Sequence, residues 1–217
     1  CLQDDIADHV LAMLKGAMAE LAVGDPRRLA TDVGPVIDAD ARAAIVAYVA
    51  SMRERGRPVF ELLLPASAEQ GTFVAPTLVE LPSLEALAGL KREVLGPVLH
   101  VVRWRRDELG ALVDAINATG YGLTHGIHTR IDETAAAILA RVRAGNVYVN
   151  RNVVGAVVGV QPFGGHGLSG TGPKAGGPLY LRRLVRGGAR SALPPSPLAL
   201  PGPTGEANTL EWHPRGV

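Results

Sequence analysis

The sequence predicts an α/β protein built on an open, mostly parallel sheet with flanking helices. Helical and strand-like stretches alternate from Cys1 to Asn150, the order expected of such sheets. The strand-like run at residues 98–102 is apolar with little polar alternation, as in strands buried on both faces. Short joints containing glycine separate the later stretches, so right-handed crossovers are expected between them. A glycine-rich loop and an extended, proline-rich tail are predicted to follow.

Two helices are expected in the first part of the chain. Asp4 or Asp5 is predicted to cap the first, which the Gly24-Asp25-Pro26 turn should end. Asp38 is predicted to cap the second, which should end near Gly56. The apolar residues at helical spacing are Ile6, Val10, Leu11, Leu14 and Met18 in the first helix, and Ile45, Tyr48, Val49 and Met52 in the second.

Strands and helices continue to alternate in the middle of the chain. Strands are predicted at residues 59–64, 73–81, 98–102, 123–129 and 146–150, and helices at residues 107–118 and 133–144. The later part of this series has the β-α-β-α-β order that builds a parallel sheet.

The composition of the sequence changes near residue 153. Nine glycines and no helical period between Gly155 and Gly177 predict a long loop, and loops of that length are usually functional. Residues 179–185 are a candidate last strand, and the proline-rich residues that follow are expected to be extended. The domains expected are therefore residues 1–187 and an extension at residues 188–217.

The composition is that of an ordinary globular protein. Of the 217 residues, 47% are hydrophobic and 20% are charged. The 22 basic and 21 acidic side chains leave a net charge of +1, which argues against nucleic acid or a membrane surface bound through bulk charge. No apolar run reaches the roughly 18 residues of a membrane span. A cytoplasmic location is expected.

Two motifs suggest binding chemistry. Glu93 precedes the Gly96-Pro97 turn and a buried strand, where its two carboxylate oxygens could accept from the hydroxyls of a ribose. A solvated surface glutamate beside a turn is the alternative. The stretch of residues 154–172 can form a nest of backbone N–H groups for a carboxylate or phosphate. It is not a phosphate loop, because no Lys-Ser/Thr follows its glycines, and a structural loop packed on a sheet is its alternative.

Three segments in order resemble the successive signatures of the aldehyde dehydrogenase superfamily. They are Glu93-Val94-Leu95-Gly96-Pro97, Ala144-Gly145-Asn146-Val147-Tyr148-Val149-Asn150 and Pro162-Phe163-Gly164-Gly165. The earlier Val33-Gly34-Pro35-Val36-Ile37 resembles the Gly-Pro turn before a helix in that family. The resemblance runs from Cys1 to about Val185, and it implies that residues 1–187 are an incomplete aldehyde dehydrogenase catalytic domain.

Finer features are similar to one branch of the superfamily. Tyr148-Val149-Asn150-Arg151-Asn152, then Gly155-Ala156 and Gln161-Pro162-Phe163, resemble the glutamate-semialdehyde (pyrroline-5-carboxylate) dehydrogenases. The run from Ser169 to Pro178 and the tail from Leu200 to Asn208 are similar to proline utilization A proteins. The implied activity is oxidation of L-glutamate γ-semialdehyde to L-glutamate with NAD in proline catabolism. Another aldehyde dehydrogenase branch, or a non-catalytic assembly module derived from one, remains an alternative.

The resemblance also implies roles for single residues. Glu93 would bind the hydroxyls of the nicotinamide ribose, and Leu95 stands where most members carry phenylalanine beside the nicotinamide. The backbone N–H groups of Gly155 and Ala156 would receive the substrate α-carboxylate, without burying an unpaired basic side chain. Phe163 would pack on the aliphatic part of the substrate and help define its length. We expect these amides to share a pocket with Glu93.

The family's catalytic residues are expected outside this chain. Members use a cysteine thiolate that forms a thiohemiacetal, passes hydride to NAD and leaves a thioester for water. The resemblance places this nucleophile and the general base before Cys1, so no catalytic residue is expected here and the 217-residue chain should be inactive alone. Cys1 is the alternative nucleophile, but the residues after it match a later strand end. It is therefore expected to be a small strand residue that packs like a hydrophobe.

Partners follow partly from the same resemblance. The chain lacks an initiator methionine and is expected to be the end of a longer protein that also carries an FAD-dependent proline dehydrogenase domain. Such proteins self-associate, so a homo-oligomer is expected, with no nucleic acid or membrane contact by this segment. No metal site is expected, because the histidines lack a second ligand at metal-binding spacing. They include His100, His125, His128 and His166.

Overall fold

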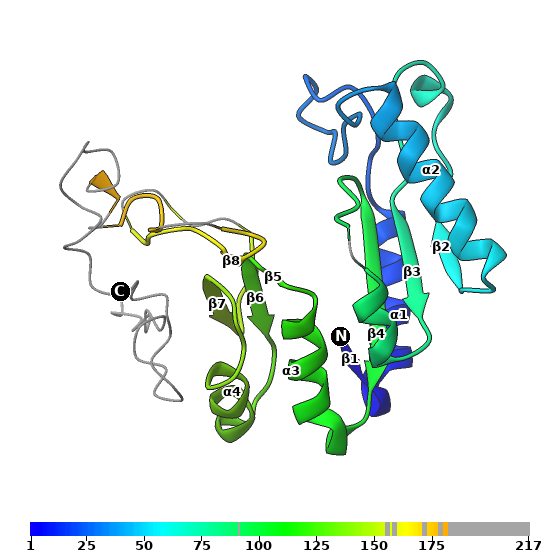
Figure 1. The fold of residues 1–217 in the computed structure, drawn as a ribbon. Helices are drawn as coiled ribbons and strands as arrows, with labels where there is room; N and C mark the ends of the chain where they lie inside the picture. Colours follow the sequence, from blue (N-terminus) through cyan, green and yellow to red (C-terminus); the bar gives the residue numbers. More distant parts are fainter. Residues whose placement is uncertain (91, 155–156, 158–159, 171–172, 178–179, 182–217) are drawn as a thin grey trace. The chain divides into compact units, whose positions relative to one another are not determined.

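The computed structural model describes residues 1–90, 92–154, 157, 160–170, 173–177 and 180–181. The chain divides into two compact units, Cys1–Ala115 and Ile116–Val217, each of which is described by itself (Figure 1). The proline-rich tail, most of the candidate last strand, and the predicted boundary at residue 187 lie outside the described residues.

The first unit is built on a four-stranded sheet in the order β1-β4-β3-β2. Its central strand β4 pairs in parallel with both β1 and β3, whereas β2 pairs antiparallel with β3 at one edge. The strands are β1 (Leu2–Gln3), β2 (Val59–Glu61), β3 (Thr77–Leu81) and β4 (Val98–Trp104). The prediction of a mostly parallel sheet is confirmed, with β2 as an antiparallel edge. The expected burial of β4 on both faces holds only in part, because Val101 and Val102 are buried whereas Leu99 is 45% exposed.

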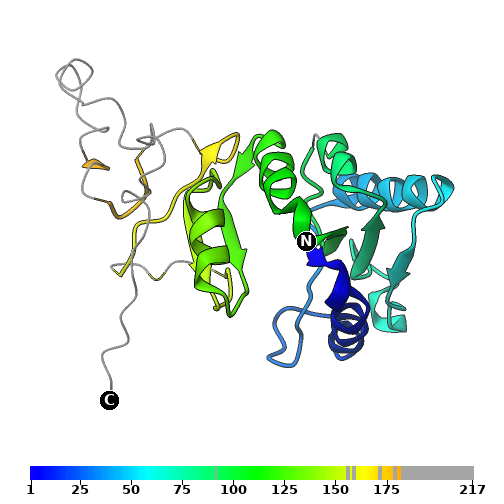
Figure 2. The ribbon, with the colours of Figure 1, turned by 90° about the horizontal axis from the view of Figure 1, so that it is seen from below.

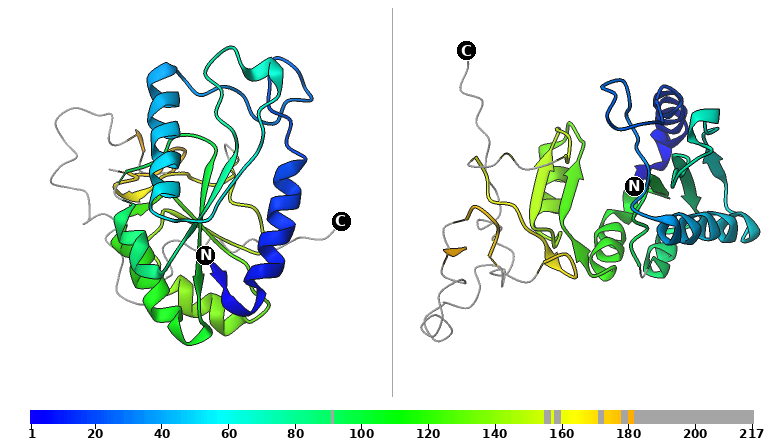
Figure 3. Two further views of the ribbon diagram at one scale, coloured as in Figure 1. Left: turned by 90° about the vertical axis from the view of Figure 1, so that its right-hand side faces the viewer. Right: turned by 90° about the horizontal axis from the view of Figure 1, so that it is seen from above.

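Helices α1 (Asp4–Ala19) and α2 (Ala39–Glu54) cover opposite faces of this sheet (Figures 2 and 3). Successive side chains of a strand point to opposite faces. Val101 of β4 accordingly packs in a cluster with Leu11 of α1, while the preceding His100 meets Tyr48 of α2. A second cluster joins Ile45 of α2 to neighbours on the sheet and its loops. Those neighbours are Val36, Val59, Val74, Val94 and Val98.

Two details of α1 differ from expectation. The predicted aspartate cap is wrong: Gln3 occupies the N-cap position without a side-chain hydrogen bond, and Asp4 and Asp5 lie in the first turn. Their charge is still favourable there, because the N-terminal end of a helix dipole is positive. Ile6 was expected to face inward but is 53% exposed, and Ala7 is fully buried instead. The face of α1 that packs on the sheet therefore includes Ala7 and not Ile6.

The signals around α2 are confirmed. The Asp38 carboxylate accepts a hydrogen bond from the Ala41 N–H at 2.7 Å, as an N-cap should. Gly56 follows the helix with φ of 69°, the left-handed conformation that glycine adopts without strain. The strand expected from residue 73 begins only at Thr77, since Pro76 has no N–H to give to a ladder.

The second unit contains a parallel βαβ arrangement. Strands β6 (Thr124–Ile127) and β7 (Asn146–Val149) pair in parallel and are joined through α4 (Asp132–Leu139). Helix α3 (Leu109–Ala118), preceded by the 3-10 turn Arg106–Glu108, ends in this unit. A short antiparallel pair, β5 (Tyr121–Gly122) with β8 (His166–Gly167), was not predicted.

Two further 3-10 helices, Ala66–Ala68 and Leu84–Gly89, belong to the first unit.

Helix α4 ends five residues before the predicted residue 144. The cause is a side chain from α3. The Asn117 carboxamide donates to the Arg141 carbonyl at 2.9 Å and accepts from the Arg143 N–H at 2.8 Å. These bonds hold the backbone of residues 141–143 in a non-helical path that the local sequence does not reveal.

Candidate functional site

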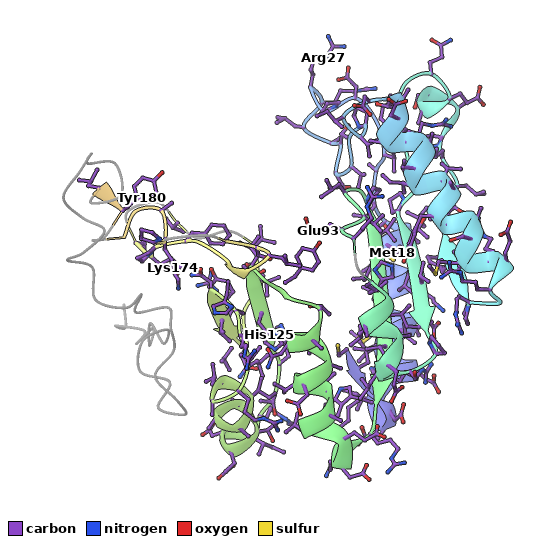
Figure 4. The ribbon with its side chains drawn as sticks, viewed as in Figure 1. Met18, Arg27, Glu93, His125, Lys174 and Tyr180 are labelled. Atoms are coloured by element: carbon purple, nitrogen blue, oxygen red, sulfur yellow. The ribbon has the colours of Figure 1, made fainter. Side chains whose placement is uncertain are left out.

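The turn before β4 presents Glu93, which is labelled in Figure 4, on the surface of the first unit. Leu95 of the same turn is also exposed. Val94 between them packs into the cluster around Ile45 and Val49. Because neighbouring residues of an extended segment point in opposite directions, anchoring Val94 inward turns Glu93 and Leu95 outward. Both are exposed, Leu95 to 76%.

Gly96 lets this turn lie directly on α2. A Cβ added there would stand 2.5 Å from Ile45 Cδ1, closer than packed atoms approach. The Gly96 N–H bonds to the Val94 carbonyl and the Val98 N–H bonds to the Gly96 carbonyl, both at 2.8 Å. These two tight bonds fix the backbone that carries Glu93 and Leu95.

The chemistry of Glu93 fits a dinucleotide ribose. Its exposed carboxylate pairs with no basic side chain in the part of the chain that the structure describes. The two carboxylate oxygens on this turn can accept from two vicinal hydroxyl groups. Leu95, two residues further, offers an exposed apolar surface.

In the second unit, Phe163 lies on an extended segment held on both sides. Its N–H donates to the Ala175 carbonyl at 3.0 Å, and the Ala175 N–H donates back at 2.8 Å. The buried Asn146 at the start of β7 binds the flanking peptides, donating to the Pro162 carbonyl at 3.0 Å and accepting from the Gly164 N–H at 3.3 Å. The half-buried Phe163 ring therefore projects from a fixed backbone.

Lys174, which precedes Ala175, also contacts the residues beside Asn146 (Figure 4). Its ammonium group donates to the Gly145 carbonyl, directly before Asn146. Burial lowers the pKa of Lys174 from its ordinary value. The sequence pattern does not predict this contact, because the partner of Lys174 is a backbone carbonyl 29 positions away.

Tyr148 of β7 organises the residues that flank the glycine-rich loop. The residue is 6% exposed, and its hydroxyl accepts from the Gln161 carboxamide at 2.8 Å. The guanidinium of Arg151 lies over the same ring, 4.6 Å from its centroid, as in a cation–π contact. Asn150 has φ of 54° and exchanges hydrogen bonds with the Thr129 backbone at 2.9 and 3.0 Å. None of these tertiary contacts was predicted from the motif.

Gly155 and Ala156, whose backbone N–H groups are predicted to bind the substrate α-carboxylate, lie outside the described residues. The structure therefore shows three of the five predicted binding residues: Glu93 and Leu95 on one turn of the first unit, and Phe163 in the second. The shared pocket of Glu93 with the two amides stays a prediction.

The structure describes the surroundings of Cys1 and His100. Cys1 is a free, exposed thiol that precedes β1, so the expectation that it packs as a small strand residue is wrong. His100 is partly buried, with its Nε2 2.6 Å from the Tyr48 hydroxyl. Among the described residues there is no group of three or more His, Cys, Asp or Glu side chains that could hold a metal ion. Within the same residues, every helix is too short or too polar to span a bilayer.

The His100 pair predicts a pH dependence of stability. Burial lowers the pKa of His100 below its ordinary 6.5, so the unfolded chain binds the proton more tightly than the folded one. The stabilisation from neutral His100 is therefore complete above pH 6.5 and is lost as pH falls through the lowered pKa. In urea denaturation, the unfolding midpoint should fall more steeply below pH 6.5 in the wild type than in His100→Gln. Equal slopes would contradict this.

Comparisons with known proteins agree with the architecture and the motifs. The aldehyde dehydrogenase family model matches residues 1–186. The chain is 60% identical over 198 residues to the bifunctional protein PutA of Escherichia coli, covering 89% of this chain and 15% of that protein. It is 38% identical over 182 residues to a 1-pyrroline-5-carboxylate dehydrogenase of Bacillus cereus, covering 83% of this chain and 34% of that protein.

Solved structures show the same likeness. A crystal structure of Bradyrhizobium japonicum proline utilization A superposes with a TM-score of 0.77 at 52% identity, covering 83% of this chain and 18% of that one. A Thermus 1-pyrroline-5-carboxylate dehydrogenase with bound NAD superposes with a TM-score of 0.71 at 33% identity, covering 83% and 34%. The chain thus spans only a minor part of the length of these relatives. Since the family model matches residues 1–186 of the 217, the chain belongs to the aldehyde dehydrogenase family.

Proposed function

We propose that this chain is part of a dehydrogenase that oxidises L-glutamate γ-semialdehyde to L-glutamate with NAD in proline catabolism. The observation that carries the proposal is the match over 83% of the chain to proteins named 1-pyrroline-5-carboxylate dehydrogenase. Pyrroline-5-carboxylate is the cyclised form of the same aldehyde. The greater identity to PutA proteins supports the same substrate.

The described residues supply binding surfaces for this reaction. The exposed Glu93 carboxylate would accept hydrogen bonds from the nicotinamide ribose, and Leu95 would lie beside the nicotinamide. Phe163, on its fixed backbone, would pack against the aliphatic part of the aldehyde. The backbone N–H groups of Gly155 and Ala156 are proposed to receive the α-carboxylate. When bound, NAD would accept the hydride, and its presence in the Thermus relative supports this cofactor.

The remaining chemistry is proposed for other parts of the full-length protein. They would supply the cysteine nucleophile, the general base and an FAD-dependent proline dehydrogenase domain. The 217 residues alone are accordingly expected to be inactive. Homo-oligomeric assembly and a cytoplasmic location belong to the same proposal.

A substrate panel on the full-length protein tests the proposal. NADH formation would be compared between L-glutamate γ-semialdehyde and an aliphatic aldehyde of equal length that lacks the α-carboxylate. A site built to hydrogen-bond that carboxylate should favour the semialdehyde by about 100-fold or more in kcat/KM. A preference for long aliphatic aldehydes would instead indicate another aldehyde dehydrogenase branch.

A further inference from the structure

The Asn146 carboxamide takes the place of a neighbouring strand beside Phe163. In an extended chain, the N–H and C=O of one residue point to one side, while the preceding C=O and the following N–H point to the other. Phe163 uses its own pair on Ala175, at 3.0 and 2.8 Å. The other pair, the Pro162 carbonyl and the Gly164 N–H, is bound by Asn146 at 3.0 and 3.3 Å.

Asparagine is the side chain that can do this. A carboxamide carries one acceptor oxygen and one donor nitrogen side by side, as a peptide edge does. An aspartate could accept from the Gly164 N–H but, when ionised, could not donate to the Pro162 carbonyl. Ser or Ala would leave at least one of the two backbone groups without its partner, which costs free energy in a buried place.

The surroundings make the contact rigid. Asn146 is 6% exposed, and its backbone is fixed by pairing of β7 with β6. The preceding Gly145 has no Cβ, which allows β7 to lie against the Gly164 backbone. Because the carboxamide is bound at both its nitrogen and its oxygen, the position of the Phe163 backbone depends directly on Asn146.

We propose that Asn146 is a positioning residue that sets the aldehyde chain-length preference by holding Phe163 in place. The inference rests on the proposed function, in which Phe163 contacts the aliphatic part of the substrate. Asn146 itself touches no substrate. Its loss should therefore weaken the discrimination between aldehydes of different length more than it slows turnover.

The test uses Asn146→Asp in the full-length protein. Steady-state kinetics would compare L-glutamate γ-semialdehyde with aldehydes one methylene shorter and longer. For each of the two other aldehydes, the kcat/KM of the semialdehyde divided by the kcat/KM of that aldehyde gives a discrimination ratio. This ratio should fall about tenfold in the variant, mainly through KM, which corresponds to the loss of one hydrogen bond to a buried group. The kcat for the semialdehyde should stay within about threefold of the wild-type value.

Asn117→Asp is the matched control. Asn117 bridges the Arg141 carbonyl and the Arg143 N–H with the same donor and acceptor, at 2.9 and 2.8 Å. It supports the end of α4 and not the Phe163 segment. Its substitution should lower the melting temperature but leave the discrimination ratio within about twofold of the wild type.

A double variant tests whether the loss of chain-length discrimination in Asn146→Asp depends on Phe163. If Asn146 acts by holding that ring, then Asn146→Asp added to Phe163→Ala should cause no further loss of discrimination. Additive losses, or an unchanged ratio in Asn146→Asp despite a lowered melting temperature, would overturn the proposal. Should Asn146→Asp fail to fold, Asn146→Ser provides the same comparison without a buried charge.

The panel also separates this inference from the proposed function. If the wild type prefers an aldehyde other than the semialdehyde, the proposed function fails. The dependence of chain-length discrimination on Asn146 is still measured on the preferred series, and an unchanged ratio there counts against the positioning role.

Discussion

Replacing Gly145 with alanine is expected to destabilise the second unit by about 3 kcal/mol, the upper end of the cost of overpacking. The added Cβ would stand 1.7 Å from the Gly164 carbonyl oxygen and 2.7 Å from its carbonyl carbon. Both contacts are with backbone, which cannot move aside as a flexible side chain does. The segment from Pro162 to Gly165 would have to shift, and the two Asn146 bonds would be lost with it. Urea denaturation of the full-length protein measures the effect.

Gly16→Ala is the control for that experiment. Gly16 lies within α1, and a Cβ added there would meet nothing within 4 Å. Alanine in a helix interior is favoured over glycine by up to about 1 kcal/mol, so this variant should be slightly more stable than the wild type. A Gly145→Ala protein as stable as Gly16→Ala would show that the two backbones do not pack as closely as described.

The elements that local chemistry determines were predictable from the sequence. The structure confirms the strand predicted from the apolar run of β4, the Asp38 cap of α2 and the glycine that follows α2. Each of these signals acts within a few residues. Exact helix ends were less predictable. The early end of α4 depends on Asn117, which is distant in sequence and close only in the fold.

The site shows the same division. The position of Glu93 on a turn before β4 follows from its Gly-Pro motif, and its outward direction follows from the burial of Val94. The support of Phe163 could not be predicted, because Asn146 and Lys174 act through backbone groups at separations of 16 to 29 residues. A motif names such residues, whereas only the fold shows what each one binds.

Replacing Glu93 with alanine is expected to raise the KM for NAD about 100-fold in the full-length protein, since hydrogen bonds to a charged group are among the stronger ones. Glu93→Gln keeps one acceptor oxygen without the charge and should give an intermediate value. Because Glu93 is exposed and the turn is held by Val94 and Gly96, neither variant should change the urea midpoint. Glu20→Ala, at an exposed glutamate just after α1, should leave the KM for NAD unchanged. An unaltered KM for NAD in Glu93→Ala would show that Glu93 is a solvated surface residue. Other residues would then have to bind the cofactor.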